Sequence, residues 1–178
     1  MELTEKTLSS EKIFDGVILH IRRDQVELPG GGRSVREVVD HPGGVCVLAL
    51  DSQWQALLVS QYRYPYQRVV REVPAGKLEY GEDPREAALR ELREETGATP
   101  GEFRSLGELY PSPGYCGEII HMYLARDLTF GESSLDEDEF LNVERIPFEE
   151  LVEQVLQGEI RDAKTIAAVL KGKLLLNL

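Results

Sequence analysis

The sequence predicts an α/β fold in which helices cover both faces of a mixed β-sheet, with a small β-rich region at the N-terminus. Apolar, β-branched runs recur along the chain, and segments of helical periodicity are interspersed among them. The length of 178 residues, 42% of them hydrophobic, suffices for one main core. We therefore expect an N-terminal strand region over residues 1–40 and a main domain over residues 41–178.

The charge balance excludes several classes of partner. Acidic residues outnumber basic residues by 32 to 20, which gives a formal net charge of -12. Nucleic acids and anionic membranes are poor partners for such a chain, because their phosphates attract Lys and Arg. No apolar run approaches the ~20 residues of a membrane span, and the first residues lack the pattern of a signal peptide. With only two cysteines, Cys46 and Cys116, we expect a cytoplasmic protein.

Short strands and turns are expected in the N-terminal region. Residues 13–21 are apolar and β-branched and predict one strand, and residues 36–39 predict another. Pro-Gly-Gly-Gly at 29–32 is expected to form a turn between these strands, and His-Pro-Gly-Gly at 41–44 is expected to end the second one. The segment at 41–44 places the boundary of the region at about residue 40.

In the main domain, residues 45–50 are the best candidate for a buried strand. Residues 56–62 are its expected hairpin partner, across a turn at 51–53. Three further strands are expected at residues 103–110, 119–125 and 140–146.

The clearest helix covers residues 83–96. Asp83 can accept hydrogen bonds at its N-terminus, and Gly97 can end it. Two more helices are expected near the end of the chain, the first opened by Pro147 and the second capped by Asp162.

This first helix carries an acidic face. Glu91, Glu94 and Glu95 have the spacing i, i+3 and i+4 and fall within one sector of about 100°, whereas Leu92 lies on the roughly opposite side. Like charges at these spacings cost about 0.2–0.5 kcal/mol per pair. Ala87 shares the acidic sector and is too small to fill the space above it.

Three carboxylates beside vacant space indicate a hard divalent cation bound through oxygen. Arg90 is placed to reach Glu94 or Glu86 and to hold a carboxylate in its working rotamer. A solvated acidic face is the alternative interpretation. The preceding glycine-bracketed loop, which contributes Glu82, favours the metal.

The spacing of these residues is specific. Gly76 is followed after five residues by Glu82 and after seven more by Arg-Glu-Leu-Arg-Glu-Glu-Thr-Gly-Ala at 90–98. This pattern resembles the Nudix box at every defined position. The segments 73–76, 110–114 and 136–139 further resemble the ADP-ribose pyrophosphatase branch of that family.

The resemblance implies a Nudix-type α/β/α sandwich and a metal-dependent hydrolase. The expected reaction splits ADP-ribose, or a related nucleoside-diphosphate sugar, into AMP and ribose 5-phosphate. Alternatives are another substrate, such as GDP-mannose or FAD, and a sensor that binds nucleotide sugars without cleaving them. The resemblance also implies Mg²⁺ or Mn²⁺ as cofactor, and a homodimer in which the N-terminal strands of one chain reach the site of the other.

Site roles follow from the same resemblance. Glu91 and Glu95 are the expected metal ligands, with Glu94 as a third acid, Glu82 as a supporting ligand and Ala75 contributing its backbone carbonyl. Arg90 and Glu94 are also assigned to the catalytic group.

The base that activates water is expected in the acidic loop 136–139, with Glu137 favoured and Glu139 as a metal contact or substitute. A solvated turn is the alternative. Substrate contacts are expected from residues outside the box, each of which could instead be an ordinary surface or strand residue: Arg36, Glu37, Arg63, Gly114 and Glu118.

Overall fold

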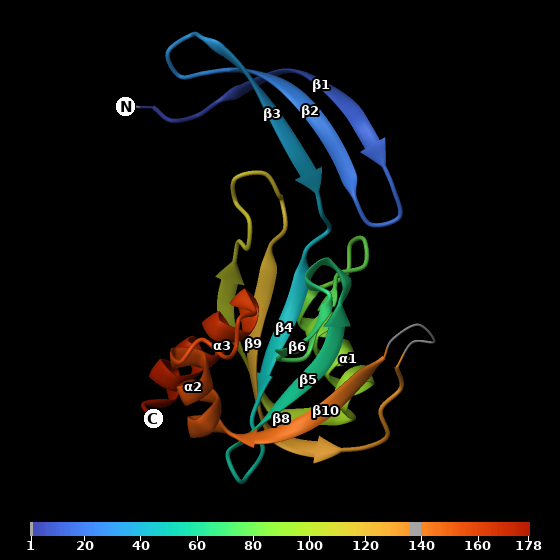
Figure 1. Cartoon of the computed structure of the whole chain (residues 1–178), viewed down its shortest axis with the longest axis vertical. Coiled ribbons are helices and arrows are strands. Elements are labelled where there is room, and N and C mark those ends of the chain that lie inside the picture. Colours follow the sequence, from blue (N-terminus) through green and yellow to red (C-terminus); the bar gives the residue numbers. More distant parts are fainter. Residues whose placement is uncertain (1, 136–139) are drawn as a thin grey trace. The chain divides into compact units, whose positions relative to one another are not determined.

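The computed structural model describes residues 2–135 and 140–178 (Figure 1). The chain divides into two compact units. The first comprises the residues up to 43 together with 110–119, and the second comprises 44–109 and 120–178. The first unit therefore takes in a loop that the division at residue 40 left in the main domain.

The first unit is built on a three-stranded antiparallel sheet. Its strands are β1 (Lys6–Asp15), β2 (His20–Glu27) and β3 (Arg33–Asp40), in the order β1-β2-β3. The single strand expected at 13–21 is wrong, because the chain reverses at Gly16, whose N–H donates to the carbonyl oxygen of Leu19 at 2.9 Å. The dipeptide Asp15-Gly16 is a turn signal at this point, but the apolar residues 17–19 that follow make the segment look like one continuous strand.

The turn predicted at 29–32 is confirmed. This segment joins β2 to β3, and the N–H of Leu28 donates to the carbonyl oxygen of Gly32 at 2.7 Å. The loop at 110–119 is bonded to β3 through Val39, which donates to Tyr115 at 2.8 Å and accepts from Gly117 at 3.0 Å.

The second unit contains the remaining elements. Its strands form a mixed sheet in the order β7-β4-β9-β8, in which β4 and β9 are parallel, and an antiparallel sheet in the order β10-β5-β6. The elements are β4 (Gly44–Ala49), β5 (Gln55–Arg63), η1 (Tyr64–Tyr66), β6 (Arg68–Glu72), β7 (Ala75–Lys77), α1 (Pro84–Thr96), β8 (Ala98–Leu109), β9 (Ile120–Phe130), β10 (Leu141–Pro147), α2 (Phe148–Leu156) and α3 (Ala163–Leu176).

Strand β4 is buried along its whole length and organises this unit. Cys46 and Leu48 point to the core on the side of α3, whereas Val45, Val47 and Ala49 point to the core on the side of α1. Figure 1 shows these helices on opposite faces of the mixed sheet. The predicted α/β fold with both sheet faces covered is thus confirmed.

The expected hairpin between 45–50 and 56–62 is wrong. One isolated bridge joins Leu50 to Ala56, after which β4 and β5 separate into different sheets. A strand that is buried along its whole length needs hydrogen-bonded strands on both edges, because its backbone N–H and C=O groups cannot reach water. β4 finds them in β7 and β9, which lie far apart in the sequence.

The helix ends follow the predicted capping. Asp83 accepts from the N–H groups of Arg85 and Glu86 at 2.9 and 3.1 Å, and Gly97 ends α1 in the left-handed region with φ 71°. Asp162 caps α3 by accepting from the N–H of Thr165 at 3.0 Å. No helix of the described part of the chain combines the length and apolarity needed to cross a bilayer.

Both cysteines are free thiols in very different surroundings. Cys46 lies in β4 and is completely buried, and this burial raises the pKa of its thiol to about 12. Cys116, in the loop at 110–119, is partly exposed.

Candidate active site

The acidic face of α1 lies against the short strand β7. Ala75, the first residue of β7, donates its N–H to a carboxylate oxygen of Glu95 at 3.0 Å. Glu95 is only 5% exposed although it lies in the last turn of the helix. The structure therefore brings the predicted residues Ala75 and Glu95 into direct contact, across 20 positions of sequence.

Gly76 permits a second close approach between the same elements. A Cβ atom built at this position would overlap the carboxyl group of Glu91. Only the absence of a side chain lets that carboxyl lie against the backbone of β7. The first glycine of the Nudix-like pattern thus allows the carboxyl group of Glu91 to occupy this position.

Arg90 gathers three of the predicted acids. Its guanidinium donates to both carboxylate oxygens of Glu82 at 3.0 and 3.1 Å, to Glu91 at 2.9 Å and to Glu94 at 2.9 Å. The predicted contact with Glu94 is confirmed. The alternative contact with Glu86 is not, since that residue pairs with Arg85 at 3.6 Å.

These contacts shift the pKa values of Arg90 and Glu82. Hydrogen bonding to Glu82, the charge of Glu91 and a hydrogen bond to Glu94 raise the pKa of Arg90. Hydrogen bonds from Arg90 and from the backbone N–H of Glu79 lower the pKa of Glu82. Arg90 thus favours the ionised form of a carboxylate that the box contributes.

One expectation about the acidic face is wrong. Ala87 leaves no vacant space, because it is completely buried in the core beside Val45 and Val47. The assignment of the glutamates as metal ligands stays a prediction: residues 2–135 and 140–178 contain no group of three or more His, Cys, Asp or Glu side chains already spaced to hold a metal ion. The carboxylates of Glu82, Glu91 and Glu94 converge on Arg90 instead.

Arg63, expected as a substrate contact, takes part in a buried ionic cluster. It donates through Nε and Nη2 to the two carboxylate oxygens of Glu72 at 2.7 and 2.8 Å. Lys164 contacts the same carboxylate from α3 and also donates to Asp162 at 3.0 Å. Glu72 is only 2% exposed, so its charge is compensated almost entirely by protein groups.

This cluster includes residues that the sequence did not single out. Glu72 is the last residue of β6, three positions before Ala75. Asp162 caps α3, and Lys164 and Thr165 lie in its first turn. Asp162 was expected only as a helix cap. No periodicity or motif links two segments some 90 positions apart, and only the fold brings them together.

The two residues of β3 that were predicted to contact substrate form ion pairs within the first unit. Arg36 donates through Nε to Glu5 at 2.9 Å, and Glu37 accepts from Arg23 at 3.3 Å. Both predicted residues are thus held by ion pairs on the β1–β3 sheet.

Two more predicted residues lie in the loop at 110–119. Gly114 is in an exposed turn, and a Cβ there would meet nothing within 4 Å. A carboxylate oxygen of Glu118 lies 3.8 Å from Nδ1 of His41. The predicted base Glu137 and its substitute Glu139 lie outside the described residues.

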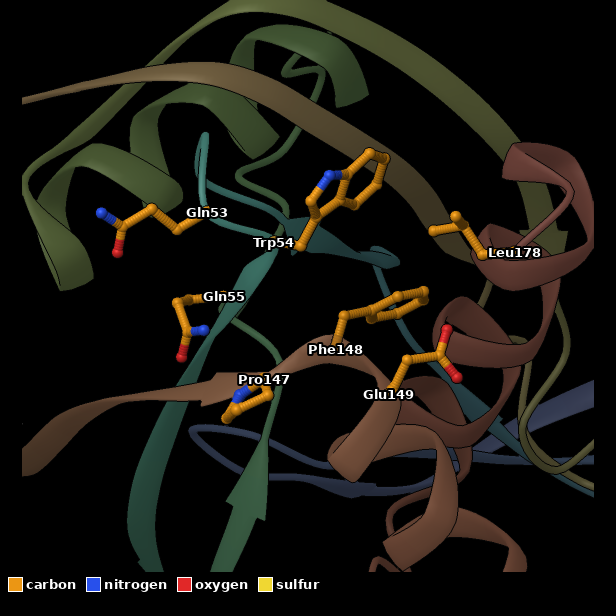
Figure 2. Close-up of a pocket in the computed structure, with 7 residues that line it drawn as sticks. All are labelled: Gln53, Trp54, Gln55, Pro147, Phe148, Glu149 and Leu178. Carbon is orange, nitrogen blue, oxygen red and sulfur yellow. The ribbon is translucent and has the colours of Figure 1, made fainter.

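A small cavity of about 300 Å³ lies elsewhere in the second unit (Figure 2). It lies where β10 meets α2, next to the turn before β5, and Trp54, Phe148 and Leu178 supply its apolar wall. Pro147, Glu149, Gln53 and Gln55 complete the lining. None of the predicted site residues belongs to it, and its volume is at the lower limit for ligand pockets, about 300–1,000 Å³.

Comparison with known proteins decides the family. The profile of the NUDIX domain matches residues 40–169. The chain belongs to the Nudix family. Residues 5–39 match the N-terminal domain of nucleoside diphosphate sugar hydrolases. Together these matches confirm the predicted reaction class, hydrolysis of a pyrophosphate bond in a nucleoside-diphosphate sugar.

Similar proteins cover nearly the whole of this Nudix chain. It is 44% identical to an ADP-ribose pyrophosphatase of Bacillus subtilis, over 94% of this chain and 91% of that protein. It is also 44% identical to a methanol dehydrogenase activator of Bacillus methanolicus, over 93% and 90%. The crystal structure of an ADP compounds hydrolase has the same fold, with a TM-score of 0.86 at 22% identity, over 99% of this chain and 97% of that one.

The buried cluster predicts a specific dependence of stability on pH. Burial alone would raise the pKa of Glu72, but the hydrogen bond from Arg63 and the charge of Lys164 outweigh it and lower the pKa below its ordinary value of 4.5. A carboxyl whose pKa is lowered by folding stabilises the folded state above its unfolded pKa. That stabilisation is lost as the pH falls through the folded value.

We therefore expect the free energy of unfolding of Glu72→Gln to lie below that of the wild type by a constant amount above about pH 5, and the gap to narrow at lower pH. Urea denaturation between about pH 3 and pH 7 measures both curves. A gap of equal size at every pH would contradict the assignment of Glu72 as an ionised partner.

Proposed function

We propose that this protein hydrolyses ADP-ribose to AMP and ribose 5-phosphate at the acidic face of α1. The observation that carries the proposal is the convergence of Glu82, Glu91 and Glu94 on Arg90, with Glu95 bonded to the first residue of β7. The similarity to an ADP-ribose pyrophosphatase over nearly the whole chain supports this substrate.

The donor set suits a hard divalent cation, Mg²⁺ or Mn²⁺. Carboxylate oxygens lie within hydrogen-bond distance of one guanidinium, and Gly76 lets one of them reach the backbone of β7. The residues that would hold the metal are Glu91, Glu95 and Glu94, supported by Glu82 and the backbone carbonyl of Ala75. A bound metal would offset the charge of the pyrophosphate and lower the pKa of a water molecule.

The chain's own residues then have distinct tasks. Arg90 orients the carboxylates and keeps Glu82 ionised. Glu137 would take the proton from the attacking water, because the box acids are engaged elsewhere. Arg63, Arg36, Glu37, Glu118 and Gly114 are proposed substrate contacts; Arg63 would act through Nη1, since Nε and Nη2 bond to Glu72.

We also propose a homodimer formed through the N-terminal strands. The turn between β1 and β2 exposes Val17, Ile18 and Leu19, with Phe14 and Ile13 beside it. Such a group of apolar side chains favours a protein partner, and a second copy of the chain is the one the family resemblance implies. The cytoplasm is the compartment that suits two free thiols.

The function predicts metal-dependent product formation. In a phosphatase-coupled assay, ADP-ribose should release phosphate with Mg²⁺ or Mn²⁺ and none with EDTA. Glu91→Gln should lower kcat by at least ~10²-fold, because it removes a charged oxygen donor of the site. Glu86→Gln, on the exposed first turn of the same helix, is the matched control and should leave the rate unchanged.

A substrate panel separates the alternatives. If GDP-mannose or FAD is hydrolysed faster than ADP-ribose, that compound is the substrate and ADP-ribose is not. Tight binding of nucleotide sugars without any product, with either metal, would show a sensor and refute the hydrolase.

The acidic loop predicts a second kinetic result. Glu137→Gln should lower kcat by ~10²-fold or more while leaving KM nearly constant, because a general base acts on the reaction step more than on binding. Glu132→Gln, an exposed acid nearby in the sequence, serves as control. If Glu137→Gln turns over at the wild-type rate and Glu139→Gln does not, the base is Glu139.

The dimer predicts a solution mass of twice the 20.0 kDa chain. Ile18→Glu places a charge in the exposed apolar turn and should shift the mass, measured by light scattering, to that of one chain. Leu156→Glu changes an exposed leucine of α2 and should leave the dimer intact. A wild-type monomer at micromolar concentration would contradict this arrangement.

A further inference from the structure

The segment that carries the chain from β6 to β7 is held from the opposite side by α3. The N–H of Val73 donates to Oγ1 of Thr165 at 2.9 Å, and this hydroxyl donates in turn to Asp162 at 2.6 Å. Thr165 is completely buried. One hydroxyl thus accepts a hydrogen bond from a backbone N–H of the segment and donates one to Asp162, the cap of the helix.

A second connection runs through side-chain charges. Lys164 bridges Glu72 and Asp162, and Glu72 precedes Val73 in the chain. The contacts therefore form a closed ring: Glu72, Lys164, Asp162, Thr165, Val73 and back to Glu72 through the peptide bond. Arg63, which is half-exposed and lies outside the ring, contacts the buried carboxylate of Glu72 as a second cation.

The same segment is anchored at every following residue. The carbonyl oxygen of Pro74 accepts from the N–H of Val47 in β4 at 2.9 Å, and Ala75 donates to Glu95 in α1 at 3.0 Å. Val73, Pro74 and Ala75 are thus tied in turn to α3, β4 and α1. At the next residue, Gly76, there is no space for even a Cβ atom beside Glu91, so a small shift of the segment would disturb the acidic face.

We propose that Lys164 and Thr165 of α3 are positioning residues of the active site, which set the location of Ala75 and Gly76 against the acidic face of α1 through Val73. They act from the opposite face of the mixed sheet and need touch neither substrate nor metal. The proposal rests on the proposed function for its kinetic consequence, whereas its structural consequence can be measured in the metal-free protein.

The structural test uses amide hydrogen exchange by NMR without metal or substrate. Thr165→Val keeps the shape of the side chain and removes the acceptor for Val73. We expect it to raise the exchange of the Val73 and Ala75 amides about tenfold relative to the slowest amides of β4. Thr165→Ser, which keeps the hydroxyl, should restore protection. Unchanged exchange at Val73 and Ala75 in Thr165→Val would overturn the proposal.

The kinetic test separates positioning from general stability. Thr165→Val should lower kcat about tenfold or more with little change in KM, and Thr165→Ser should recover most of it. Val169→Ala removes buried volume from the same helix without touching the ring, so it should lower the melting temperature and leave kcat and the Val73 amide unaffected. Equal kinetic losses in Val169→Ala and Thr165→Val would overturn the proposal.

Lys164→Met provides an independent variant, since it keeps the stem of the side chain and removes the charge that joins Glu72 to Asp162. It should raise exchange at Val73 and lower kcat in the same sense as Thr165→Val, and wild-type values of both would overturn the role of Lys164.

The failures of the two proposals are distinguishable. A wild type without hydrolase activity refutes the proposed function, whereas unaltered exchange refutes the positioning role even if the enzyme is active.

Discussion

Burial of β4 on both faces is the constraint on which the second unit depends. A strand without a solvent face must have strands on both edges and helices above and below. The chain meets this requirement by placing α1 and α3 on opposite faces and by inserting the three-residue strand β7 along one edge of β4. β7 is short because its task is local: it presents backbone atoms of Ala75 and Gly76 to the acidic side chains of α1.

The acidic face of α1 shows how like charges are tolerated in a folded protein. Glu91, Glu94 and Glu95 repel one another at their helical spacing, yet each has a structural counterpart within reach. Arg90 donates hydrogen bonds to Glu91 and Glu94, and the N–H of Ala75 donates one to Glu95. The helix therefore keeps several carboxylate oxygens close together through contacts that the protein itself supplies.

Most local features of the chain were predictable, with the turn at Gly16 as the exception, and long-range features were not. The caps at Asp83 and Asp162, the turn at 29–32 and the box around Arg90 depend on residues a few positions apart, so their geometry follows from spacing. The false hairpin after β4 and the pairing of Glu72 with Lys164 depend on contacts between distant segments. Apolar runs specify that a strand is buried but not which strand lies beside it.

The contrast between the two thiols has a practical consequence. Because Cys46 is enclosed in β4 and its pKa is raised to about 12, it carries almost no thiolate at neutral pH, whereas Cys116 is partly exposed. A maleimide dye would therefore enter the native chain at Cys116 alone, with no mutagenesis. The label would lie in the same loop as Gly114 and Glu118, where its fluorescence would report directly on events in the first unit.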